Sequence, residues 1–137
     1  MTRIHFNNRI VNGKWYDHSG PKIVLVDTWP GADETIESSW FLRFKIDYPL
    51  SRPVTIERFH VDGNGWTQKQ FVEMICRVYA DIYAAEDDPG HIPGMLNRGK
   101  SEGPYGIWGH DIGDLVLEYA TKVGEGEDAH WQLGVGS

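Results

Sequence analysis

The sequence has a single cysteine, Cys76, and no uninterrupted apolar run longer than the four residues 23–26. One thiol excludes an intrachain disulfide, and runs this short exclude a transmembrane helix. Because no signal-peptide pattern precedes the domain, we expect an intracellular protein that is not secreted. Basic residues are also outnumbered, and the formal net charge is −7. This charge opposes direct nucleic-acid binding and also disfavours an anionic membrane surface.

The chain has the composition of a globular protein, and its 137 residues include six tryptophans. This length suits a single domain, 1–137, which can bury roughly two-thirds of the surface of the unfolded chain. The tryptophans indicate either a rich core or an aromatic surface for a partner or a sugar. We therefore expect one soluble, acidic domain.

Residues 68–85 have the pattern of a long amphipathic helix. Thr67 and Gln70 have the spacing of a capping box, and Trp66 precedes them where it can pack against Phe71. One wide apolar stripe runs along the predicted helix. Its members are Phe71, Val72, Ile75, Cys76, Val78, Tyr79, Ile82 and Tyr83. A stripe this wide predicts a sheet beneath the helix, and it places the thiol of Cys76 in the core.

Alternating apolar and polar residues predict two strands before this helix. Residues 36–47 are expected to form one strand, with Trp40 on its buried face beside Leu42, Phe44 and Ile46. Residues 54–61 form the second strand. Its apolar residues change parity between Ile56 and Phe59, which predicts a β-bulge.

Turn signals predict further strands at both ends of the chain. The Asn-Gly pair at 12–13 predicts a hairpin in the N-terminal segment, and a brief apolar strand follows at 22–27. Residues 115–123 alternate regularly and pair with 131–135 across a glycine-rich turn, which predicts a C-terminal hairpin.

These elements predict an α+β fold, in which an antiparallel sheet of about five strands carries one long helix, about residues 68–85, on one face. Phe41 and Val116 indicate that other chain segments or a second subunit cover the second face. Residues 87–106 are broken by proline-glycine pairs and predict a long loop or arm, which we expect to reach a second copy. A symmetric homodimer is the expected oligomer.

Residues 102–118 combine four glycines and a proline with large apolar side chains and several polar ones. Burying one large aromatic side chain is worth about 1.5–3 kcal/mol, so the segment is expected to pack on the domain. Its candidate interaction or structural residues are Tyr105, Trp108, His110, Asp111, Asp114 and Glu118. The polar members either form a metal or proton-transfer site, or cap a turn and satisfy backbone groups. The second interpretation is favoured, so we assign no catalytic residue and no metal ligand, and expect no cofactor.

Residues 94–101 match the phosphate-binding pattern G-x-x-x-x-G-K-S. That motif requires a strand before the loop and a helix that begins at the Lys-Ser pair. Here the loop follows a helix, and the sequence after it, Glu-Gly-Pro-Tyr-Gly, cannot begin one. The match is therefore rejected.

The run YGIWGHDIGDLVLE, residues 105–118, resembles a motif in short uncharacterised proteins of large double-stranded-DNA viruses, marseillevirus-like ones especially, and of some fungi. The likeness is clearest over residues 102–118 and transfers no catalytic assignment. It implies a viral protein that is virion-associated or directed at the host, and that is located in the virion or the infected-host cytoplasm.

The sequence supports two functional hypotheses. The first is a non-enzymatic protein-interaction or structural protein, a homo-oligomer that binds protein through residues 87–110 and exposed aromatic side chains. The alternative is a small metal-assisted hydrolase centred on His110, Asp111 and Asp114. Under the alternative, metal should accompany the purified protein, and His110→Ala should abolish turnover while leaving folding intact.

Overall fold

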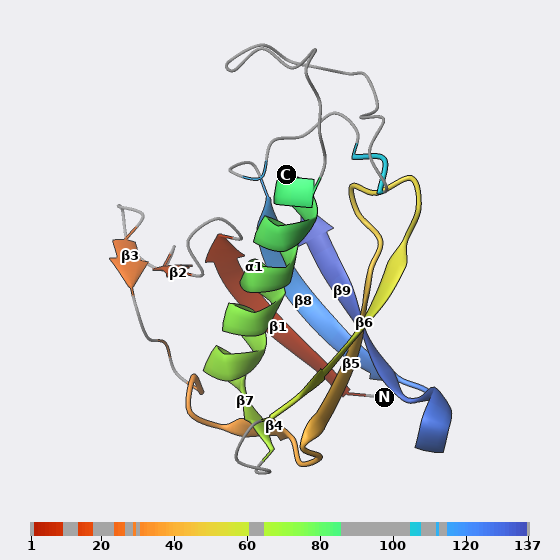
Figure 1. The fold of residues 1–137 in the computed structure, drawn as a ribbon. Helices are drawn as coiled ribbons and strands as arrows, with labels where there is room; N and C mark the ends of the chain where they lie inside the picture. The colour runs from red at the N-terminus through yellow and green to blue at the C-terminus, as the bar shows by residue number, and fades with distance from the viewer. Residues whose placement is uncertain are drawn as a thin grey trace.

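In the computed structural model of the chain, one long helix packs against one large sheet (Figure 1). The described residues are 2–9, 14–17, 24–26, 29, 31–60, 65–85, 105–107, 112 and 115–136. The helix α1 (Gln68–Ala85) has the predicted bounds, and the predicted α+β class is confirmed. The loop expected at 87–106 lies outside the described residues except for its last two. Within the described part, no helix is long and apolar enough to cross a membrane.

The main sheet contains, within the described residues, seven strands in the order β3-β2-β1-β8-β9-β5-β6. Their bounds are β1 (Thr2–Arg9), β2 (Lys14–Asp17), β3 (Val24–Val26), β5 (Phe41–Ile46), β6 (Val54–Phe59), β8 (Val116–Val123) and β9 (His130–Gly136). Neighbouring strands are antiparallel except β5 and β9, which run parallel, so the sheet is mixed rather than wholly antiparallel. A separate two-stranded sheet pairs β4 (Thr35–Glu37) with β7 (Trp66–Thr67).

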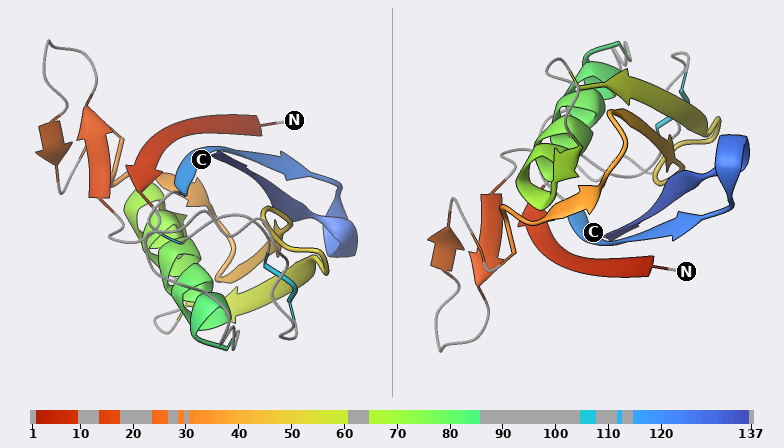
Figure 2. Two further views of the ribbon diagram at one scale, coloured as in Figure 1. Left: turned by 90° about the horizontal axis from the view of Figure 1, so that it is seen from above. Right: turned by 90° about the horizontal axis from the view of Figure 1, so that it is seen from below.

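Both predicted hairpins are present, β1 with β2 and β8 with β9. Figure 2 shows that the sheet is curved and that α1 lies inside the curve. The sheet therefore has a helix side and an opposite side, which we call the outer face. Side chains on the helix side form the core, so any exposed apolar group on the outer face needs a separate explanation.

The apolar stripe of α1 is the centre of the core. Phe71, Val72, Ile75 and Tyr79 are fully buried, and Cys76 is buried as predicted. The Phe71 ring meets the Trp131 ring edge-on, with centroids 5.2 Å apart. The stripe packs against side chains of the sheet, and this packing stabilises the helix. The helix therefore forms where the apolar pattern predicts it.

The predicted capping box fixes the start of α1. The Thr67 N–H donates to Gln70 Oε1 at 3.0 Å, and the Gln70 N–H donates to Thr67 Oγ1 at 3.2 Å. Two main-chain donors at the helix start are thereby satisfied.

Near the other end of α1, the Tyr79 hydroxyl donates to the Tyr48 carbonyl at 2.6 Å. Burial, with a smaller contribution from the neighbouring Tyr83, raises the pKa of Tyr79 well above its usual range. The phenol therefore stays protonated and remains a hydrogen-bond donor.

The prediction of one strand over 36–47 is wrong, because β4 ends at Glu37 and β5 begins at Phe41. Within β5 the alternation is as predicted, and Leu42, Phe44 and Ile46 are fully buried. Trp40, predicted on that buried face, is instead 52% exposed. The break between the two strands interrupts the alternation, so residues before it do not share the face of those after it.

The bulge predicted in 54–61 is also wrong. Strands β5 and β6 pair without interruption from Phe41↔Phe59 to Ile46↔Val54. The change of parity instead places Phe59 on the outer face. A register shift occurs elsewhere, in β8 between Leu117 and Tyr119, so the regular alternation predicted for 115–123 fails there. Because of this shift, both Leu117 and Ala120 are buried on the helix side.

Gly65 immediately precedes β7 and lies directly against the β4 backbone. A Cβ at this position would lie 2.2 Å from the carbonyl oxygen of Glu37, and rotation of a side chain cannot relieve a clash with main chain. We expect Gly65→Ala to lower the free energy of unfolding by about 1–3 kcal/mol, measured by denaturant titration. Gly136→Ala is the matched control, because its added methyl meets the exposed carboxylate of Glu118, which can move. Equal losses in the two variants would contradict this account.

Candidate functional site

The structure describes two of the six candidate residues predicted in 102–118. Tyr105 is half-buried and packs against the core, whereas Glu118 is exposed on β8. The remaining four, Trp108, His110, Asp111 and Asp114, lie outside the described residues, so both interpretations of them stay predictions. Among the residues that are described, no group of three or more His, Cys, Asp or Glu side chains could hold a metal ion.

Residues 105–107 lie against the turn between β5 and β6. The Ser51 N–H donates to the Gly106 carbonyl at 2.9 Å, and the Arg52 N–H donates to the Tyr105 carbonyl at 3.1 Å. Leu50 forms an isolated antiparallel bridge with Ile107, whose side chain is buried. These contacts anchor the β5–β6 turn to a segment distant in sequence, and so fix the start of β6.

A cluster of three aromatic side chains lies at the other end of β5 and β6. We call Trp40, Phe41 and Phe59 the aromatic patch. Trp40 and Phe59 are 52% and 56% exposed, and they are the exposed large hydrophobic residues of the described chain. The Phe59 ring centroid lies 4.7 Å from that of Trp40 and 5.1 Å from that of Phe41. Clustered apolar side chains left in water are typical of an interaction surface.

Main-chain contacts hold the aromatic patch in place. The Trp40 carbonyl accepts from the His60 N–H at 2.7 Å and from the Trp66 indole N–H at 3.2 Å. The Phe41 N–H donates to Ser39 Oγ at 3.1 Å. Trp40 is thus exposed on a fixed backbone, because its carbonyl is bonded to two other elements.

Charged residues lie beside the aromatic rings, and we call Arg43 and Glu57 the rim of the patch. The Arg43 guanidinium lies 5.0 Å from the centre of the Phe41 ring, and its Nε donates to Glu57 Oε1 at 3.0 Å. Its Nη1 donates to the Glu127 carbonyl. Three contacts therefore fix one cation beside an exposed aromatic surface, which is the residue combination favoured in binding hot spots.

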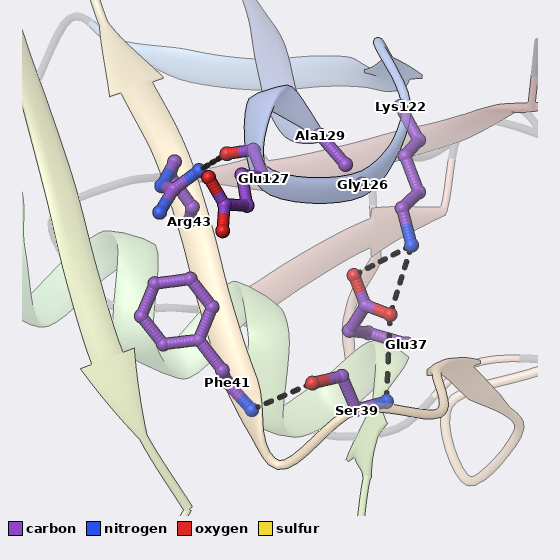
Figure 3. Close-up of a pocket in the computed structure, with 8 residues that line it drawn as sticks. All are labelled: Glu37, Ser39, Phe41, Arg43, Lys122, Gly126, Glu127 and Ala129. Carbon is purple, nitrogen blue, oxygen red and sulfur yellow. Dashed lines mark hydrogen bonds and ion pairs between the residues drawn. The ribbon is translucent and has the colours of Figure 1, made fainter.

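A cavity of about 460 Å³ adjoins the patch (Figure 3). It forms because β9 begins at His130, so the first residues of β5 face the turn η2 (Gly126–Asp128) instead of a paired strand. The lining residues are Glu37, Ser39, Phe41, Arg43, Lys122, Gly126, Glu127 and Ala129. The cavity shares Phe41 and Arg43 with the patch and its rim.

The charges around this cavity balance. Glu37 is 7% exposed, and its carboxylate accepts from Lys122 Nζ at 2.9 Å and from the Trp131 indole N–H at 3.3 Å. The lining carries two cations, Arg43 and Lys122, and two anions, Glu37 and Glu127. With no net charge, the cavity has little electrostatic preference for an ion. The aromatic patch is therefore the stronger functional feature of this region.

Sequence reasoning missed this patch. It placed Trp40 on the buried face and attributed the parity of Phe59 to a bulge. The signal that could have found it is the Ser-Ser pair at 38–39, which interrupts the alternation immediately before three large apolar residues. A polar interruption there indicates a break between strands, after which Trp40 no longer shares the face of Leu42.

Removing Lys122 would leave the buried Glu37 carboxylate without its cation. We expect Lys122→Met to lower the free energy of unfolding by about 1–3 kcal/mol, toward the lower end because Lys122 is 35% exposed. Combining it with Glu37→Gln should recover part of that loss, because a neutral amide needs no cation. Denaturant unfolding of the wild type, both single variants and the double variant measures the coupling. Purely additive losses would show that the pair is not coupled.

The comparisons with known proteins provide no identification. No family model matches the chain, and neither a curated protein nor a solved structure does.

Proposed function

We propose that the protein is a non-enzymatic protein-interaction or structural protein that acts as a homodimer through its aromatic patch. The observation that carries this proposal is the joint exposure of Trp40 and Phe59, which pack on each other and not under the helix. Each exposed aromatic side chain that becomes buried contributes about 1.5–3 kcal/mol.

The chemistry of the patch favours protein as the partner. Aromatic side chains and arginine are enriched in the buried centres of protein interfaces, and here Arg43 already stacks on Phe41. A net charge of −7 opposes nucleic acid, whose binding depends on neutralising phosphates. For a single chain type, the default closed assembly is a two-fold dimer, in which the same patch serves both copies.

The resemblance of residues 102–118 to the motif in proteins of large double-stranded-DNA viruses bears on the origin and location of the protein. We propose a viral origin and a virion-associated or host-directed role, in the virion or the infected-host cytoplasm. The patch is formed by residues 40, 41 and 59 and lies outside the resembling segment, so its role in assembly can be tested independently of origin.

Making the patch polar should dissociate the dimer. We expect size-exclusion chromatography with light scattering to give the mass of two chains for the wild type and of one chain for Trp40→Ser/Phe59→Ser. The apolar surface that drives association is lost in the variant, while the core is untouched.

The matched control is Glu73→Ser/Asp81→Ser, which changes two exposed residues of α1 and should remain dimeric. Circular dichroism checks that each variant is folded. A monomeric wild type, or a dimer that survives loss of both aromatic rings, contradicts the proposed function.

A further inference from the structure

We infer that β6 pairs with β6 of a second copy, in antiparallel orientation about a two-fold axis at Ile56, to form one continuous sheet. The inference rests on the proposed function, because it names the contact through which the homodimer forms. It requires that β6 has a free edge, that one register is compatible with its charges, and that its apolar residues gain contacts.

The first requirement concerns the main chain of β6. This strand is at the end of the strand order, and among the described residues only β5 pairs with it. The His60 N–H donates to the Trp40 carbonyl, which continues the β5–β6 register by one pair. Hydrogen-bonded pairs alternate along an antiparallel ladder. The main-chain groups of residues 54, 56 and 58 therefore point to β5, and those of 55, 57 and 59 point away from it.

An independent contact agrees with this assignment. The Glu57 carbonyl accepts a hydrogen bond from Arg58 Nη1 at 2.9 Å, and both residues are exposed. A carbonyl that reaches the neighbouring exposed side chain does not point into the β5 ladder. Because its present partner is an exposed surface side chain, another N–H can replace it at small cost.

Within the part of the chain that the structure describes, the edge of β6 lacks the usual protection. Natural edge strands avoid pairing through bulges, internal proline or lysine side chains. The register between β6 and β5 is uninterrupted, and residues 54–59 contain neither proline nor lysine. Arg58 is the one basic residue of the strand, and it bonds to the edge carbonyl itself. With respect to the described residues, a row of outward main-chain groups therefore remains accessible for another strand.

The second requirement selects one register among those a two-fold axis allows. An axis at Glu57 would place two carboxylates directly opposite each other, and an axis at Arg58 would oppose two guanidinium groups. An axis at Thr55 would place Arg52 opposite Arg58, so two like charges would again face each other. An axis at Ile56 avoids all three conflicts, because it places Thr55 opposite Glu57 and Val54 opposite Arg58.

The third requirement concerns the side chains that this register brings together. Val54 and Ile56 lie on the helix side and are only partly buried against the core. Pairing about Ile56 places the two Ile56 side chains side by side, so the core continues across the interface. On the outer face, Phe59 of one copy lies opposite Pro53 of the other. The second copy therefore contacts the aromatic patch at its most exposed ring.

A cysteine at the axis tests this register directly. The two Ile56 residues form a non-hydrogen-bonded pair, whose Cα atoms lie about 4.5 Å apart, within the range of a disulfide. We expect Ile56→Cys to form a disulfide-linked dimer under mild oxidation, measured by non-reducing electrophoresis. Val54→Cys is the matched control, because its two copies are four residues apart along the strands, about 13 Å. The wild type, whose single thiol is the buried Cys76, gives the background.

Thr55→Pro tests the edge hydrogen bonds. It removes an N–H that points to the second copy and none that bonds to β5, so the fold should persist while the light-scattering mass falls to one chain. A monomeric wild type would overturn the inference and the proposed function together. A wild-type dimer that Thr55→Pro leaves intact, or in which Ile56→Cys cross-links no better than Val54→Cys, would overturn the inference alone.

Discussion

The buried carboxylate of Glu37 is the contact on which this surface depends. It accepts from Lys122 on β8 and from the Trp131 indole on β9, and thereby ties the short strand β4 to the main sheet. A buried charge is costly unless it is paired and hydrogen-bonded, so β4 is held where both donors reach it. The chain leaves β4 at Glu37 and reaches Trp40 three residues later. The position of the aromatic patch therefore follows from an ionic contact between β4 and β8.

The same region explains why an exposed tryptophan is held in one place. Gly65 lets the β7 backbone approach Glu37 closely, and Trp66 then donates its indole N–H to the Trp40 carbonyl. One buried tryptophan thus positions the backbone of an exposed one. A side chain presented on a fixed backbone loses less conformational entropy on binding than one in a loose loop. This is the physical reason for treating the patch as a preorganised contact surface.

Local rules predicted the parts of the fold that depend on neighbours in sequence. The helix, its capping box and the buried stripe, including Cys76, are where periodicity placed them. The alternation of Leu42, Phe44 and Ile46 was also readable, because each faces the same helix. The parallel pairing of β5 with β9 was not, since it joins segments almost ninety residues apart and leaves no local pattern. The register shift in β8 also leaves no local pattern, so the sequence did not predict it.

The candidate site was harder to predict for a related reason. The segment 102–118 attracted attention because its unusual residues are adjacent in sequence. The aromatic patch instead combines residues 40 and 41 with residue 59, which meet only because β5 and β6 pair in one register. A shift of one position in that register would move Phe59 to the helix side, so its ring would no longer contact Trp40 and Phe41. Surfaces that depend on strand pairing need the structure before they can be seen.

The aromatic patch and the open edge meet at one residue, and this coincidence favours a strand as the partner. Phe59 is the last residue of β6, so its ring belongs to the patch while its main-chain groups belong to the edge. A globular surface placed on the patch would bury the ring but leave the row of N–H and C=O groups without strand partners. A strand placed along β6 satisfies that row and covers the ring in the same step. One partner therefore engages both features, which is why pairing along β6 is a better account of this surface than contact with the aromatic rings alone.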